Sequence, residues 1–279
     1  MAGILSGLAG LGLNNLENME IYEKPKSDTA EQKAVAKLEE KDLIYDKTFS
    51  CPVCGKNFSS KIMKSGKAKL IGTDPDLRPR YDGIDMAKYE VEMCPNCGYS
   101  ALSRFFTGLS GGQIKLIQEH ISSKVQLHPH DGETYTYEEA MERYKLALAC
   151  AVVKRARASE KAYICLKSGW LLRGYAEYQK ENGLDNPSPE SLKEEEDEYL
   201  LNAYNGFVEA RQNESFPMCG MDEVTIDFLL AELAYRFKKY DVASRMVASI
   251  LTSVSANART KDKARDLKDR ILADLKKKQ

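Results

Sequence analysis

The chain has 279 residues, a formal net charge of −1 at pH 7 and 43% hydrophobic residues. A chain of this length and composition is predicted to be soluble and globular, with one large domain or two modest ones. The balanced charge argues against binding of a polyanion through bulk charge, and no apolar run approaches the length of a membrane span. Seven cysteines, four of them in metal-type spacing, favour a reducing compartment, so we expect a cytoplasmic protein.

Residues 1–42 contain an apolar, glycine-rich stretch and then a polar stretch rich in lysine and glutamate. The apolar stretch lacks the positive region of a signal peptide, and Ala2 stands where N-myristoylation requires glycine. Glycines such as Gly7 and Gly10 weaken any helix that Leu5 and Leu8 could form. We therefore expect residues 1–42 to be a flexible Gly-rich tail followed by a polar linker.

Two Cys-Pro-x-Cys-Gly motifs, at residues 51–55 and 94–98, are the most specific feature of the sequence. A tight turn can offer two thiolates separated by two residues, and a second such turn completes a tetrahedral site. We predict that Zn²⁺ is bound by four thiolates, those of Cys51, Cys54, Cys94 and Cys97. Four protein ligands leave no open position for water, so this zinc is predicted to be structural. A redox pair of CxxC motifs and a rubredoxin-like iron site are the alternatives.

The segment around these motifs, residues 43–102, is predicted to be a small β-rich, zinc-ribbon-like head. Strands are expected at residues 43–49, 69–72 and 89–93, with glycine and proline marking the turns between them. Such a head has little core of its own, so the metal must supply much of its folding free energy.

From Ala101 onward, apolar residues recur at spacings of three and four, which is typical of helices. Residues 100–106 are expected to open the first helix. We predict an all-α body over residues 103–279 and a chain that is mainly α. The acidic run at residues 194–198 is expected to begin a helix, where negative charge suits the helix dipole and needs no partner.

Part of the body carries a repeat-like pattern. Tyr137, Ala140, Tyr144 and Ala147 match the second helix of a tetratricopeptide unit, where small alanines let two helices approach closely. We therefore predict tetratricopeptide-like helical hairpins; a plain helical bundle is the alternative.

The most unusual polar cluster lies between the two cysteine motifs. Asp74 and Asp76 could act as acid/base groups or bind a hard cation, with Arg78 and Arg80 available for an anion. Alternatively, the aspartates cap turns and pair with the arginines. No Ser/His/Asp set, P-loop or GxGxxG fingerprint is present, so we expect no catalytic residues.

Two further groups of residues suggest binding. Residues Lys56–Arg80 hold seven basic residues against two acidic ones, a local charge of +5 that could contact nucleic-acid phosphates. The alternative is a solvated surface. His128 and His130 lie together in a turn-rich loop without a matched ligand pair, so we expect them to be exposed and not to bind a metal.

Several separated motifs together resemble a bacterial family of unknown function. They are CPVCG, a loop with Asp74, Asp76, Pro79 and Tyr81, YEVEMCPNCGYSAL, WLLR at residues 170–173, Glu214 with Phe216 and Pro217, and AELAYRFKKYDVA. The resemblance covers roughly Leu43 to the C-terminus and implies a two-knuckle zinc head joined to a tetratricopeptide-like body. The chain reads IDMAKYE where the family carries INPxxYE, which affects the local turn and not the metal ligands. The resemblance implies no biochemical activity.

These features favour a zinc-stabilised protein-interaction module, an adaptor whose stacked hairpins present a concave face to a protein or peptide. Nucleic-acid binding through the basic residues of the head is the alternative. An enzyme that uses Asp74 and Asp76 is less favoured, because no complete nucleophile and base set is visible. A thiol redox switch at the cysteine motifs is also less favoured.

Overall fold

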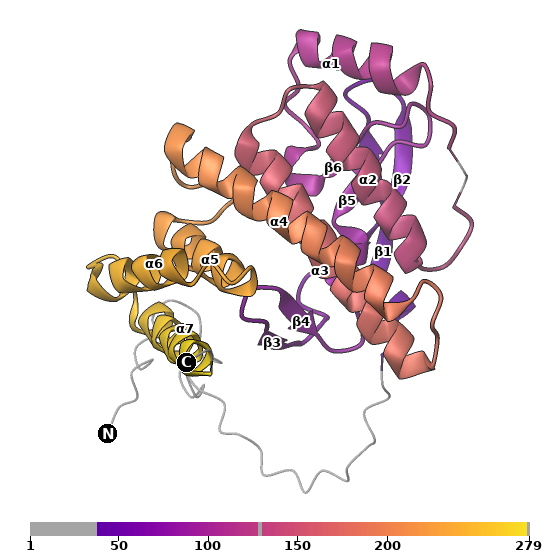
Figure 1. Cartoon of the computed structure of the whole chain (residues 1–279). Helices are drawn as coiled ribbons and strands as arrows, with labels where there is room; N and C mark the ends of the chain where they lie inside the picture. The colour runs from indigo at the N-terminus through magenta and orange to yellow at the C-terminus, as the bar shows by residue number, and fades with distance from the viewer. Residues whose placement is uncertain (1–37, 128–129, 278–279) are drawn as a thin grey trace, which may run out of the picture. The chain divides into compact units, whose positions relative to one another are not determined.

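Three antiparallel β-hairpins precede the long helices in residues 38–127 and 130–277, the parts that the computed structural model describes. The strands are β1 (Ile44–Ser50) with β2 (Asn57–Met63), β3 (Leu70–Thr73) with β4 (Pro79–Tyr81), and β5 (Val91–Met93) with β6 (Ser100–Leu102). Figure 1 shows that β3 and β4 lie apart from the other two hairpins. The expected tail and most of the expected linker, residues 1–37, lie outside the described residues.

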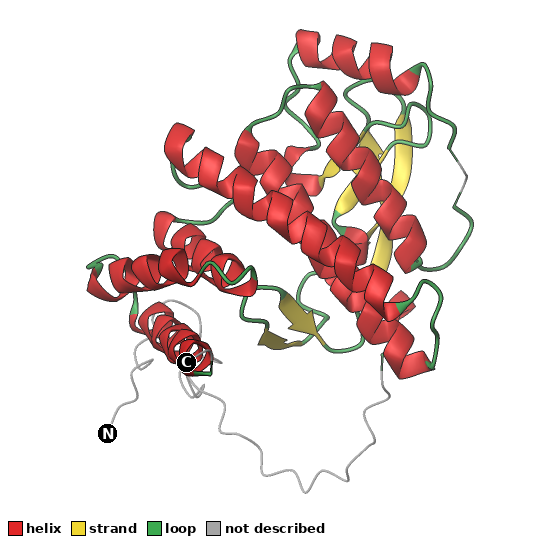
Figure 2. Ribbon diagram, in the orientation of Figure 1, coloured by secondary structure: helices red, strands yellow, loops and turns green. Residues whose placement is uncertain are grey.

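The body consists of helices, seven of which are α-helices in the described residues (Figure 2). They are α1 (Gly111–Ile117), α2 (Tyr137–Val153), α3 (Ala158–Asn182), α4 (Pro189–Asn213), α5 (Glu223–Arg236), α6 (Tyr240–Thr252) and α7 (Ala258–Lys276). Several of these helices are capped at the N-terminus by a side chain. At the start of α2, for example, the Thr136 hydroxyl accepts a hydrogen bond from the backbone N–H of Glu139. α3 ends at Asn182 and is followed by Gly183, whose φ of 66° is favourable only for glycine and a few polar residues.

The pair α3 and α4 packs closely because small residues line the contact. A Cβ atom at Gly206 of α4 would lie 2.9 Å from Cβ of Ala162, and one at Gly169 of α3 would lie 2.7 Å from Leu200 Cδ2. Contacts run from the start of α3 against the end of α4, so the two helices are antiparallel. This hairpin is the centre of the body (Figure 1).

Hydrophobic clusters join the β-hairpins to the helices. Val91 of β5 and Leu102 of β6 share a cluster with Tyr144 of α2 and Leu171 of α3. A second large cluster joins α3 to α7. The described residues fall into a single compact unit, and the division at residues 102 and 103 stays a prediction.

The prediction of a mainly α chain is confirmed, with small two-stranded sheets first and helices after them. The expected helix at residues 100–106 is wrong: residues 100–102 form β6, and Ser103–Phe105 form a short 3-10 helix. The reason is the pairing of Leu102 with Val91, since the second cysteine motif is the turn of a hairpin and needs a returning strand. In the described part of the chain, no helix is both long and apolar enough to cross a membrane.

Candidate functional site

The two cysteine motifs have the same backbone geometry. Each is the turn of a hairpin, β1–β2 or β5–β6, closed by the first cysteine: Cys51 N–H donates to Lys56 O at 3.0 Å, and Cys94 N–H to Tyr99 O at 2.9 Å. The glycines that follow, Gly55 and Gly98, have φ of 72° and 73°, which a Cβ would disfavour. The two motifs therefore form equivalent turns, and their thiols lie close to one another.

The four thiols lie within 4.8 Å of one another. The sulfur atoms of Cys51 and Cys97 are 3.6 Å apart, and those of Cys54 and Cys94 are 3.7 Å apart. A tetrahedron with metal–sulfur bonds of about 2.3 Å has sulfur–sulfur edges of about 3.8 Å, whereas a disulfide is about 2.05 Å long. All seven cysteines are free, and the four-thiol cluster fits a divalent metal ion.

The surroundings favour negative charge at one thiol of the cluster: the pKa of Cys51 is lowered, whereas burial raises that of Cys94, and the hydrogen bond to Cys51 raises that of Cys97. A hydrogen bond from the Cys97 thiol, followed by backbone amides of Cys54 and Val53, lowers the pKa of Cys51 to about 5. Cys51, Cys94 and Cys97 are buried, and Phe58, Tyr99 and Phe106 pack around the cluster. Three of the four cysteines are thus shielded from solvent, which suits a structural metal.

Cys150 lies beside the cluster without joining it. Its thiol contacts the carbonyl oxygen of Gly98 at 3.9 Å, and burial raises its pKa to about 11. Burial likewise raises the pKa of Cys165 to about 11 and that of Cys219 to about 12. These three cysteines are therefore protonated at neutral pH and are poor nucleophiles.

The Asp74–Arg80 segment comprises the β3–β4 turn and the start of β4, and side chains of α3 bind the turn. Arg173 donates to Asp74 Oδ2 at 3.0 Å and to Asp76 Oδ2 at 2.6 Å. Trp170, one helical turn earlier, donates its indole N–H to Asp76 Oδ2 at 3.1 Å. Sequence reasoning missed these partners, although WLLR holds Trp170 and Arg173 three residues apart, on one helical face.

The two arginines of the segment are paired as well. Arg78 donates to Asp85 at 3.1 Å and to Glu177 at 3.0 Å, and Arg80 binds Glu177 at 2.6 Å and also Asp74. Burial would raise the pKa of Asp74, but hydrogen bonds from Arg80 and Arg173 lower it overall. Asp74 is thus ionised, and both aspartates are bound by Arg173, so neither is a free base.

The expected basic surface is interrupted by these pairs. Arg78 and Arg80 bind carboxylates, Lys61 lies 3.3 Å from Asp46, and Lys64 donates to a backbone carbonyl. Three lysines of the segment are exposed and have no ion pair within the described residues, namely Lys56, Lys67 and Lys69.

Of the two histidines considered for a metal, only His130 lies in the described residues. Its Nδ1 atom lies 2.7 Å from Glu139 Oε1, and its ring packs edge-on against Tyr135. His128 lies outside the described residues. The described residues group no histidine with other ligands in a metal-type cluster.

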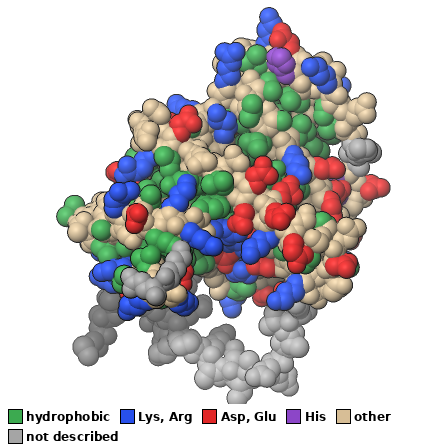
Figure 3. Space-filling view, viewed as in Figure 1, with side chains coloured by type: hydrophobic (Ala, Val, Ile, Leu, Met, Phe, Trp, Pro, Cys, Tyr) green, Lys and Arg blue, Asp and Glu red, His purple; other side chains and the backbone are tan. Residues whose placement is uncertain are grey.

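The acidic run of α4 has partners, contrary to expectation. α4 begins at Pro189, so residues 194–198 lie beyond its first turn. Arg173 binds Glu196 at 2.8 Å, and Arg236 of α5 binds Asp197 at 2.7 Å. Figure 3 shows acidic side chains gathered over the N-terminal half of α4. The expectation failed because the run wraps around the helix, and one face of it meets arginines from α3 and α5.

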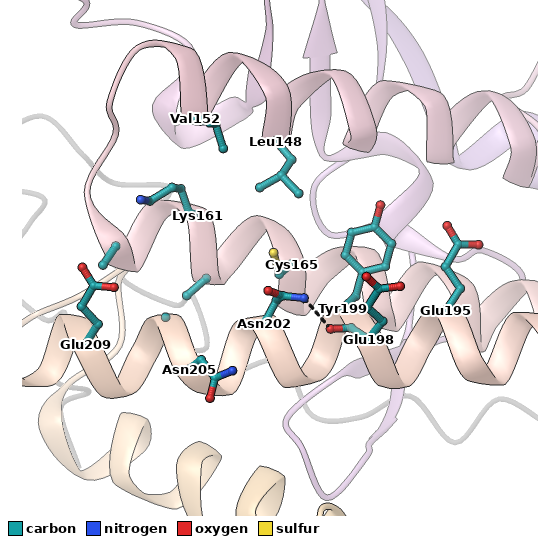
Figure 4. Close-up of a pocket in the computed structure, with 13 residues that line it drawn as sticks. Leu148, Val152, Lys161, Cys165, Glu195, Glu198, Tyr199, Asn202, Asn205 and Glu209 are labelled. Atoms are coloured by element: carbon teal, nitrogen blue, oxygen red, sulfur yellow. Dashed lines mark hydrogen bonds between the residues drawn. The ribbon is translucent and has the colours of Figure 1, made fainter.

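The opposite face of α4 lines a groove with α2 and α3. The groove has a volume of about 520 Å³ (Figure 4). Leu148 and Val152 of α2 form one wall, and Glu198, Asn202 and Glu209 of α4 lie on the other. Sequence reasoning missed this surface, because it exists only through the packing of three helices.

The fold and the cysteine cluster define a mainly α-helical protein with a candidate four-thiol metal centre at its N-terminal hairpins. Residues 44–271 match a bacterial family described as an uncharacterized protein conserved in bacteria (DUF2225), so the chain belongs to that family. Searches of curated proteins and of solved structures found no match.

Proposed function

We propose that this chain is a cytoplasmic, zinc-stabilised protein-interaction module that binds a protein segment in the groove between α2, α3 and α4. The groove carries the proposal: its volume of about 520 Å³ is within the range of ligand-binding clefts. One wall exposes aliphatic side chains and the other exposes polar ones, a combination suited to recognition of an amphipathic segment.

The metal in this proposal is zinc, held by Cys51, Cys54, Cys94 and Cys97. The sulfur–sulfur distances of 3.6 and 3.7 Å and the thiol-only donor set support it. Zinc would hold two hairpins together and thereby fix β5 and β6 against α2. Metal analysis of the purified full chain, with about one zinc per chain expected, tests the assignment against iron.

The body is proposed to consist of tetratricopeptide-like hairpins. Ala140 and Ala147, the small positions of the repeat-like pattern in α2, are 1% exposed, as helix contacts in such repeats require. The α3–α4 contact through Gly206 and Ala162 is of the same kind. Helices packed in this way keep one face free of helix contacts, and the groove lies on such a free face.

The binding function is tested by cross-linking in the native lysate, with and without nuclease. A photoreactive residue replaces Asn205, which lines the groove, or Lys268, an exposed residue of α7. We expect a partner that cross-links through position 205, survives nuclease and is lost when Asn202→Trp fills the groove. Partners captured equally from both positions, or none at all, would contradict the proposal.

One observation supports the alternative of nucleic-acid binding: Lys56, Lys67 and Lys69 are exposed. Triple replacement by glutamine should abolish a salt-dependent affinity for RNA or DNA if this alternative holds. An affinity that does not change with salt would end it. A catalytic role for Asp74 and Asp76 is not proposed, since both carboxylates are bound by arginine.

A further inference from the structure

We propose that the segment bound in this groove is a basic amphipathic helix, aligned with α4 by lysine or arginine residues about three turns apart. This inference rests on the proposed binding function and specifies the chemistry of the partner. It is carried by the charges, spacing and backbone of the groove walls.

The polar wall of the groove follows a single stripe of α4. Glu198, Asn202, Asn205 and Glu209 line it at spacings of four, three and four residues. Eleven residues are close to three helical turns, so the two glutamates share one face and lie roughly 17 Å apart along the axis. A carboxylate therefore stands at each end of the stripe, with two amides between.

These two carboxylates have no cation of their own. Glu195, the third carboxylate of the lining, is bound by Lys145 at 2.9 Å. Glu198 and Glu209 are exposed and form no ion pair within the described residues. Lys161 is the only cation in the lining, so the groove has an excess of negative charge that favours a basic partner.

The facing wall is apolar. Val152 at the end of α2 is 58% exposed, and Leu148 lies one turn before it on the same face. Figure 4 shows both side chains directed toward the groove, whose floor includes Ala162 and Cys165 of α3. A ligand must therefore be apolar toward α2 and basic toward α4, which is the pattern of an amphipathic helix.

The backbone of the walls favours a helix over an extended strand. Residues of α2, α3 and α4 use their backbone N–H and C=O groups within their own helices, so the walls offer no strand edge. A helix satisfies its own backbone hydrogen bonds, and only its side chains need partners in the groove.

The test is a selection of displayed 18-residue helical peptides against the immobilised full chain. Two double variants are compared with it. Glu198→Lys/Glu209→Lys inverts the charge of the groove wall, whereas Asp266→Lys/Asp269→Lys makes the same change in net charge at exposed positions of α7. An Asn202→Trp variant, which fills the groove without changing its charge, reports whether binding occurs there.

We expect the selected peptides to carry lysine or arginine ten or eleven positions apart, beside an apolar stripe. Resynthesised peptides should bind the α7 variant like the natural chain and the groove variant about tenfold more weakly. Peptides that Asn202→Trp blocks, but that lack the basic pair or ignore the charge inversion, overturn the inference and leave groove binding intact. If no selected peptide is sensitive to Asn202→Trp, both the inference and the proposed function fail.

Discussion

Gly174 of α3 and Asp85 are so close that no side chain fits between them. A Cβ atom at Gly174 would lie 1.9 Å from Asp85 Oδ2 and 2.8 Å from Arg78 Nη2. The absence of a side chain at this position lets the buried Asp85–Arg78 ion pair rest directly on the helix.

Gly174→Ala should therefore lower the free energy of unfolding by about 3 kcal/mol, through steric displacement of a buried ion pair. In an open helical position the same change stabilises by up to about 1 kcal/mol, so the sign is informative. Urea denaturation measures the effect. Gly112→Ala in α1, where an added Cβ meets nothing within 4 Å, is the matched control and should be neutral or stabilising.

Arg173→Lys should lower stability by about 2–4 kcal/mol, because one ammonium group cannot replace a guanidinium that binds Asp74, Asp76 and Glu196. Thermal and urea unfolding would show it. The control is Arg265→Lys on α7, because Arg265 forms an exposed ion pair with Asp262. This change should alter stability by less than about 0.5 kcal/mol. Equal effects of the two changes would mean that the Arg173 contacts add little.

Cys94→Ser should remove the metal and lower the melting temperature, because three thiolates bind zinc far less well than four. A strong chelator should shift the melting temperature of the natural chain toward that of the variant and leave the variant unchanged. Cys150→Ala keeps the four thiols of the cluster and should retain the metal. A full complement of metal in Cys94→Ser would refute the four-thiol centre.

Glu92→Gln should stabilise the protein at neutral pH. Glu92 is 0% exposed, its Oε2 atom has no hydrogen-bond partner among the described residues, and burial raises its pKa despite a hydrogen bond from Ser103. A carboxyl whose pKa is raised on folding opposes folding once pH exceeds its unfolded pKa, about 4.3.

The advantage of the Glu92→Gln variant should accordingly be absent below about pH 4, grow as pH rises from the unfolded pKa to the raised folded pKa, and stay constant above it. Urea midpoints across this range, for both proteins, give the difference directly. A constant difference at all pH values would show that the charge of Glu92 does not matter.

The four-thiol cluster could be predicted from sequence because its cysteines lie in two local turns. Each CPxCG motif fixes two thiols by itself, and only the meeting of the two turns needs the fold. The mainly helical body was equally accessible, since its apolar residues recur with helical spacing.

The arginine network could not be predicted in the same way. Arg173 binds Asp74 across 99 positions of the chain, and no local pattern specifies a contact at that separation. The sequence suggested that Asp74 could pair with Arg80, and the two residues do pair. It did not indicate that a residue of α3 also binds Asp74. Likewise, residues 194–198 look uniform in sequence, and only packing decides that Glu196 meets arginine while Glu198 faces the groove.

A metal ion bound by all four thiols would act as a covalent-like cross-link, because the thiols are arranged crosswise. Cys54 and Cys94, 3.7 Å apart, are separated by 40 positions, so a bound ion closes a large ring that contains β2, β3, β4 and β5. Closing a ring of this size removes about 4 kcal/mol of unfolded-chain entropy in a simple polymer estimate. Loss of the ion would reopen the ring, and the β3–β4 turn would then be held by its contacts with α3, such as those of Arg173 and Trp170. The rate of proteolytic cleavage at Lys64–Lys69 should therefore depend on metal occupancy, although these residues are not metal ligands.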